Sequence, residues 1–122
     1  MAEKNTRSVN TFEENMKKAF TELLVLYMLS EKDYYIAELS DAILERSHHT
    51  IAINRPYAVI MRLLEASPPY IVEIKRRESA ESRIRQYYSI TEQGREYLAE
   101  LLESYHKYIP AINATLTSGE TV

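Results

Sequence analysis

Residues 82–102 read SRIRQYYSITEQGREYLAELL, and within this stretch a basic extended segment changes directly into an amphipathic helix. Ile84, Tyr88 and Ile90 recur with a period of two, which is typical of a strand that has one face on a core. Thr91 is predicted to be the N-cap of the following helix, because its hydroxyl can accept a hydrogen bond from a free backbone N–H. The stretch therefore predicts a strand that leads without a linker into a helix.

The predicted final helix, residues 91–112, carries one apolar stripe along its whole length, because apolar side chains recur there at steps of three and four. A stripe of this length needs a partner to cover it. In the first predicted helix, residues 11–30, one side of the first half is charged and exposed to solvent. The N-terminal end of this helix is therefore expected to extend away from the domain body and to pack on a second subunit. The expected dimer interface consists of Phe12, Met16, Phe20, Leu98, Leu101, Leu102, Tyr105 and Ile109.

The segment from Arg85 to Arg95, RQYYSITEQGR, resembles the RxYYxLTxxG signature of the PadR-like winged-helix transcriptional regulators. The order of predicted elements over residues 11–112 is similar to that family as well, in particular to its small members with a single C-terminal dimerisation helix. The resemblance implies a mainly α (α+β) fold, a winged helix-turn-helix with a two-stranded wing and a C-terminal dimerisation helix.

On this basis the 122-residue chain is expected to have four parts. They are a flexible N-terminal arm (1–10), a winged helix-turn-helix DNA-binding domain (11–90), a C-terminal dimerisation helix (91–112) and a flexible tail (113–122). Within the second part, residues 31–34 form a polar turn. Tyr70, Val72 and Ile74 alternate into a strand that pairs with residues 84–90 to form the wing.

Composition excludes several classes of protein. The chain has no cysteine and no apolar run near the ~20 residues of a membrane span, so a soluble, cytoplasmic protein with no membrane partner is expected. It has no glycine-rich phosphate loop and no nucleophile in a recognisable motif, so neither catalysis nor a cofactor is expected. His48 and His49 are adjacent and point apart, without further ligands at metal-binding spacing. They are interpreted as a solvated or phosphate-contacting pair and not as a metal site.

The charge distribution favours a nucleic-acid partner although the net charge is −3. Residues 75–85 contain five basic and two acidic residues, so this segment carries +3 and the remainder −6. A local basic patch can attract DNA even when the total charge is acidic.

The predicted third helix supplies the side chains that can read bases. Asn54 is expected to cap it, and Pro56 fits its first turn. Arg pairs well with guanine and Asn with adenine in the major groove. Tyr57 matches the Tyr of the family's Thr-Leu-Tyr run, whereas Arg55 departs from its Thr. The expected DNA-binding residues are Asn54, Arg55, Tyr57, Arg62, Lys75, Arg76, Arg77, Arg83 and Arg85.

The ten tyrosines include two candidates for a ligand site. Tyr105 falls where the small PadR-like multidrug-sensing regulators carry an aromatic residue that lines a pore between subunits, and the same resemblance brings Tyr27 near it from the first helix. The competing interpretation of both residues is ordinary dimer packing.

The resemblance thus implies a transcriptional regulator, a repressor that binds a pseudo-palindromic operator in double-stranded DNA as a homodimer. A planar aromatic effector that releases the DNA is a further expectation. Two alternatives remain open at this point. One is a winged-helix repressor of another lineage with a different dimer mode, and the other is a winged-helix module that binds protein and not DNA.

Overall fold

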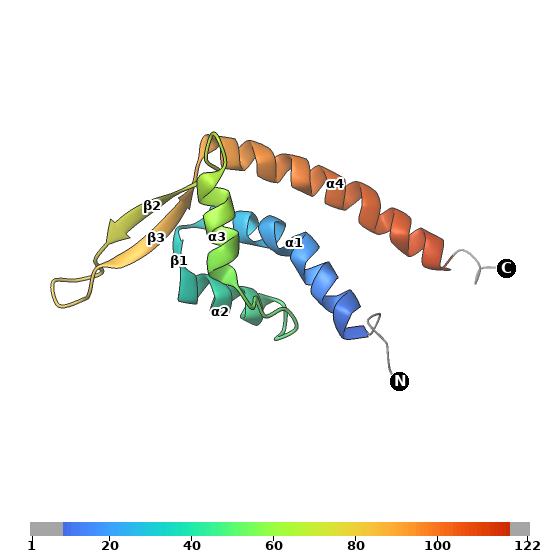
Figure 1. Ribbon diagram of the computed structural model, residues 1–122, viewed down its shortest axis with the longest axis horizontal. Helices are drawn as coiled ribbons and strands as arrows, with labels where there is room; N and C mark the ends of the chain where they lie inside the picture. The colour runs from blue at the N-terminus through green and yellow to red at the C-terminus, as the bar shows by residue number, and fades with distance from the viewer. Residues whose placement is uncertain (1–8, 118–122) are drawn as a thin grey trace.

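The computed structural model describes residues 9–117, which form helices around a small sheet (Figure 1). The elements in chain order are α1 (Val9–Glu31), β1 (Tyr34–Tyr35), α2 (Ile36–Arg46), α3 (Pro56–Glu65), β2 (Ile71–Arg76), β3 (Arg85–Ile90) and α4 (Glu92–Thr117). Within this part of the chain, none of the helices combines the length and the hydropathy needed to cross a membrane.

The second half of α1, together with α2, α3 and the sheet, encloses one hydrophobic core. Leu26 of α1, Leu39 of α2, Ile60 of α3 and Ile71 of β2 are each at most 1% exposed. Each such side chain contributes about 1.5–3 kcal/mol by leaving water. The predicted mainly α (α+β) winged-helix fold is confirmed.

The sheet has three antiparallel strands in the order β1-β3-β2, one more than the sequence indicated. Tyr34 pairs with Tyr88 and Tyr35 with Tyr87. The placement of Tyr34 in a polar turn was therefore wrong, and its side chain is only 6% exposed. A strand of two residues is too short to show a period, which is why the sequence pattern did not reveal it.

The wing strands are also shifted from their predicted positions. Strand β3 begins at Arg85, and Ile84, which was expected on its inner face, is 56% exposed. In β2 the buried residue is Ile71, opposite Ile90. Val72 and Ile74 consequently lie on the outer face. Most of the wing projects beyond the core (Figure 1), so an alternating pattern there does not report burial.

The predicted N-cap at the junction of β3 and α4 is confirmed. The hydroxyl of Thr91 accepts a hydrogen bond from the backbone N–H of Gly94 (3.0 Å) and donates one to the carbonyl of Pro69 (2.8 Å). The backbone N–H of Thr91 donates to the carbonyl oxygen of Tyr70 (3.0 Å). These bonds fix the start of α4 against the segment that connects α3 to β2.

Helices α1 and α4 leave the body on the same side, with their free ends farthest from the sheet (Figure 1). Both are longer than predicted, since α1 begins at Val9 and α4 continues to Thr117. The hydroxyls of Thr115 and Thr117 donate to the carbonyls of Ala111 and Asn113 within the helix, so polar residues continue it. Residues 1–8 of the expected arm and 118–122 of the expected tail lie outside the described residues.

Candidate nucleic-acid interface

The turn between α2 and α3 orients the candidate reading helix. His48 and His49 have φ angles of 55° and 61°, the left-handed region that few side chains adopt. Their backbone N–H groups donate to the carbonyls of Glu45 and Leu44 (3.1 and 2.8 Å), and the hydroxyl of Ser47 accepts a bond from the N–H of Ile51 (2.9 Å). The histidine pair thus closes the last turn of α2.

The start of helix α3 differs from the prediction in the identity of its N-cap residue. Pro56 occupies its first turn as expected, but the N-cap residue is Arg55 and no side chain caps the helix. Asn54 lies one residue too early, and its side-chain amide donates to Oε1 of Glu14 on α1 (3.5 Å). The predicted capping role of Asn54 is therefore wrong, because the loop 51–55 approaches α1 before α3 starts.

The exposed face of α3 is divided between two neighbours. Tyr57 is 59% exposed and lies near Tyr88 on the wing side. On the other side, Nε of Arg62 donates to Oε2 of Glu22 on α1 (3.1 Å). Arg62 was predicted to contact DNA, but the structure places it in an ion pair.

The ion pair between Arg62 and Glu22 extends to α4. The phenol of Tyr97 donates to Oε1 of Glu22 (3.1 Å), and the Tyr97 ring stacks on Tyr70 with 4.4 Å between ring centroids. Burial raises the pKa of Tyr97, and the Glu22 carboxylate adds to the shift. Glu22 therefore connects the reading helix to the helix that was predicted to dimerise.

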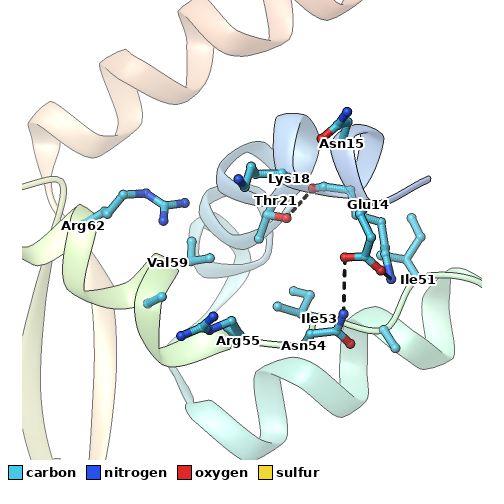
Figure 2. Close-up of a pocket in the computed structure, with 13 residues that line it drawn as sticks. Glu14, Asn15, Lys18, Thr21, Ile51, Ile53, Asn54, Arg55, Val59 and Arg62 are labelled. Atoms are coloured by element: carbon cyan, nitrogen blue, oxygen red, sulfur yellow. Dashed lines mark hydrogen bonds and ion pairs between the residues drawn. The ribbon is translucent and has the colours of Figure 1, made fainter. Parts of the chain in front are cut away.

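A cleft of about 430 Å³ opens between the N-terminal half of α1 and α3 (Figure 2), and we call it the α1–α3 cleft. It is lined by Glu14, Asn15, Lys17, Lys18, Thr21, Ile51, Ala52, Ile53, Asn54, Arg55, Ala58, Val59 and Arg62. Asn54, Arg55 and Arg62 of the predicted reading surface thus belong to one concave site. The cleft could not be predicted from the sequence pattern, because its walls come from segments about 40 residues apart.

The wing carries the remaining predicted DNA-binding residues, in two settings. Within the described residues, Lys75 and Arg83 are exposed and make no side-chain hydrogen bond or ion pair to the protein, and Arg77 bonds only the carbonyl of Ala80 in the loop (3.3 Å). These three cations are available to phosphates.

Arg76 and Arg85 instead belong to an aromatic cluster on the outer face of the sheet. The guanidinium of Arg76 lies 4.3 Å from the ring centroid of Tyr87 and donates to Oδ2 of Asp33 (2.7 Å). The guanidinium of Arg85 lies 4.4 Å from the ring centroid of Tyr35. Such contacts orient an arginine side chain while leaving some of its N–H donors free.

The alternation of Ile84, Tyr88 and Ile90 implies that Tyr87 points to the free face of the strand, but it is only 4% exposed. The Tyr35 ring packs edge-on against it at 5.4 Å, Arg76 covers its face, and its phenol donates to the Glu78 carboxylate of the wing loop. The hydrogen bond to Glu78 and burial raise the pKa of Tyr87 to about 12. The outer face of the sheet is therefore a second, smaller packed layer.

The predicted dimer residues divide into a buried and an exposed group. Leu98 is 7% exposed and belongs to the core of its own chain, and Leu101 and Leu102 pack partly against that core. Leu98 is thus wrongly assigned to the interface, because α4 crosses the body before it projects. Phe12 and Met16 are exposed, and Phe20 packs edge-on against Tyr105.

The two projecting helices bear an exposed apolar surface, which we call the α1/α4 face. Its most exposed large side chains are Val9, Phe12, Met16, Tyr105, Tyr108, Ile112 and Leu116. A pocket of about 230 Å³ between the helices is lined by apolar residues that include Phe20, Tyr105 and Ile109. Tyr27, the other predicted ligand residue, does not line this pocket, because it lies beside Glu31 near the far end of α1.

Comparison with known proteins gives a consistent picture. The sequence profile described as "Transcriptional regulator PadR-like family" matches residues 25–100. An uncharacterised protein from Lysinibacillus sphaericus is 31% identical over 84 residues, which are 67% of this chain and 74% of that protein.

Solved structures are similar over most of the chain. A PadR-like transcriptional regulator from Bacillus cereus superimposes with a TM-score of 0.72 at 25% identity, covering 84% of this chain and 96% of that one. A transcriptional regulator from Clostridium thermocellum gives 0.70 at 26% identity, with 81% and 95% covered.

Proposed function

The chain belongs to the PadR-like family of transcriptional regulators, and we propose that it binds double-stranded operator DNA as a homodimer and represses transcription in the cytoplasm. The family consists of regulators and not enzymes. The observation that carries the proposal is the set of wing cations that have no acidic partner within residues 9–117, beside an exposed reading helix.

The DNA contacts are assigned by the setting of each side chain. We assign Arg55 and Asn54 at the start of α3, with Tyr57 behind them, to contacts with base edges in the major groove. Lys75, Arg77, Arg83 and Arg85 of the wing are assigned to phosphates or the minor groove, which position the protein without reading sequence. Arg62 and Arg76 hold Glu22 and Asp33, so they act first by orienting α3 and the wing.

Homodimer formation is supported by the α1/α4 face. Phe12 and Leu116 are 62% and 70% exposed, and a monomer rarely leaves so many large apolar side chains together in water. A two-fold dimer would present two copies of α3 to half-sites about one DNA turn apart, so the operator is expected to be pseudo-palindromic.

We assign the proposed ligand site to the interface of this dimer. Tyr105 borders the pocket between α1 and α4 and is 38% exposed, and in a dimer we expect it and its copy from the partner to stack on a planar aromatic molecule. A ligand there would change the angle between the two reading heads. Tyr27 would contribute only from the second subunit, since it lies away from this pocket in its own chain.

The proposal is tested by incubating the protein with fragmented genomic DNA of its source organism and sequencing the bound fragments. Recovered fragments should share a two-fold motif and be retained over random duplexes, with affinity falling steeply as salt rises. Failure to retain any duplex at low salt would instead favour the winged-helix module that binds protein.

A further inference from the structure

We propose that Tyr87 is a positioning residue for DNA binding, which holds the carboxylate of Glu78 on the outer face of the sheet and so keeps it away from the cations of the wing. This role rests on the proposed function, because it concerns the same wing. Three features support it: the charge of the wing loop, the hydrogen bond between the two side chains and the packing that fixes the Tyr87 ring.

The wing loop, residues 77–84 between β2 and β3, is formally neutral. Its two cations are Arg77 and Arg83, and its two carboxylates are Glu78 and Glu81. Affinity for the DNA backbone comes from cations that neutralise phosphates. A loop whose carboxylates pair with its own cations therefore contributes little, and the position of each carboxylate decides whether the loop attracts DNA.

The structure keeps Glu78 apart from these cations. Its Oε2 accepts a hydrogen bond from the phenol of Tyr87 in β3, which holds the carboxylate against the sheet. Within residues 9–117, Arg83 has no acidic partner, and Arg77 bonds only the carbonyl of Ala80 (3.3 Å). The phenol thus occupies an acid that could otherwise neutralise one of the two arginines.

The Tyr87 ring is fixed by its neighbours and cannot follow the loop. It is 4% exposed, with the guanidinium of Arg76 4.3 Å from its centroid and the Tyr35 ring edge-on at 5.4 Å. Arg76 is itself held by Oδ2 of Asp33 (2.7 Å). The first tyrosine of the Tyr-Tyr pair therefore has a role of its own, since the second, Tyr88, lies in the hydrophobic core.

Loss of the phenol should release Glu78 to pair with Arg77 or Arg83, so that one cation no longer contacts a phosphate. Tyr87→Phe keeps the ring and its packing but removes the donor. We expect it to bind specific and random duplexes about tenfold more weakly, as the loss of one charge-assisted contact predicts. The salt slope should fall by about one.

Gel shifts at several salt concentrations compare the wild type, Tyr87→Phe, Glu78→Gln and the double variant. Because the released acid causes the loss, Glu78→Gln should raise the affinity of the Tyr87→Phe protein about tenfold and restore its salt slope, but raise that of the wild type much less. Glu81→Gln removes the same charge from the same loop and should act equally in both backgrounds. A loss in Tyr87→Phe that Glu78→Gln does not restore would overturn the proposal and leave Tyr87 as a packing residue.

A measurement without DNA tests the hold of Tyr87 on the loop. Relaxation of backbone amides reports order on the picosecond to nanosecond scale. Amides 78–83 should become more mobile in Tyr87→Phe and also in Glu78→Ala, which cuts the same bond from the exposed side. Tyr108→Phe, at an exposed position of α4, is the control and should leave them unchanged.

The two measurements distinguish failure of this role from failure of the proposed function. Unchanged loop mobility in both Tyr87→Phe and Glu78→Ala would overturn the role, as would DNA binding that Tyr87→Phe leaves intact. A wild type that retains no duplex at low salt would instead refute the proposed function, and the role on DNA with it, while loop mobility would still show whether Tyr87 holds Glu78.

Discussion

Gly94 shows how strictly one residue of the family motif is determined. A Cβ added at this position would lie 2.1 Å from the carbonyl oxygen of Tyr70 and 2.7 Å from Cγ1 of Ile90. The Tyr70 carbonyl cannot move away, because it accepts the hydrogen bond from the backbone N–H of Thr91. The motif therefore requires glycine for close approach of the backbone, although the position is helical.

We expect Gly94→Ala to lower the free energy of unfolding by about 3 kcal/mol, the upper part of the usual range for overpacking. Helix propensity alone would predict the opposite sign, a gain of about 1 kcal/mol. Urea denaturation followed by circular dichroism measures the difference. Gln93→Ala, an exposed neighbour in the same turn, is the control and should change stability little. A Gly94→Ala variant as stable as the wild type would contradict the packing argument.

Tyr87 predicts a specific loss of stability at alkaline pH. Its pKa in the folded protein is raised to about 12, whereas an unfolded tyrosine titrates near its ordinary value of 10. A raised pKa means that the folded state favours the protonated phenol, so this contribution is complete below pH ~10 and is lost as the pH rises toward 12.

The stability advantage of the wild type over Tyr87→Phe should therefore shrink between pH 10 and pH 12. Urea denaturation of both proteins at several pH values measures it. The matched control is Tyr108→Phe, which changes an exposed tyrosine of α4. If the difference in free energy of unfolding between wild type and Tyr87→Phe stays constant over this pH range, the hydrogen bond to Glu78 does not raise the pKa of the Tyr87 phenol.

At the scale of elements, α3 and the wing are expected to play different parts on DNA. Arg55→Ala should cost about 1–3 kcal/mol at one base position and relax specificity there. Arg85→Ala should weaken binding to all sequences alike and reduce the salt slope by about one. The reason is that Arg55 lies at the start of a helix that can enter the major groove, while Arg85 lies on a hairpin. Gel shifts on specific and random duplexes at several salt concentrations compare them, and equal losses on both duplexes for both variants would contradict the division.

The helices and the wing were predictable because their apolar residues repeat along the chain, and the cap at Thr91 because its bonds are local. The same patterns could not assign partners. Leu98 lies on the stripe of α4, but only the docking of α4 on α1 decides that it faces its own core and not a second subunit. Arg62 and Arg76 were read as free cations, since their partners Glu22 and Asp33 are 40 and 43 residues away. The α1–α3 cleft depends on docking in the same way.

At the scale of the whole molecule, a planar aromatic effector is expected to bind at the dimer interface and to change operator affinity from there. A planar aromatic compound that binds beside Tyr105 can lower operator affinity only by the ratio of its affinities for the free and DNA-bound arrangements. Titration with planar aromatic compounds, followed by tyrosine fluorescence and by release of operator DNA, measures both effects. Tyr105→Ala should lose ligand binding, and Lys107→Ala, two residues further along α4 at a position that does not line the pocket, should keep it. Undiminished binding to Tyr105→Ala would leave Tyr105 as a packing residue.

The assembly itself depends on the α1/α4 face. Ile112 is 48% exposed in the monomer and lies on the stripe that lines the outer end of this face. In a two-fold dimer each substitution acts twice, so losing two buried isoleucines costs about 3 kcal/mol or more, which is roughly hundredfold in the dimer Kd. Ile112→Asp should therefore be monomeric at micromolar concentration in sedimentation experiments while keeping the helical content of the wild type. Ala114→Asp adds the same charge on the opposite side of α4, two residues and about 200° around the helix, and should stay dimeric. A wild-type chain that sediments as a stable monomer would show that the exposed stripe serves another partner.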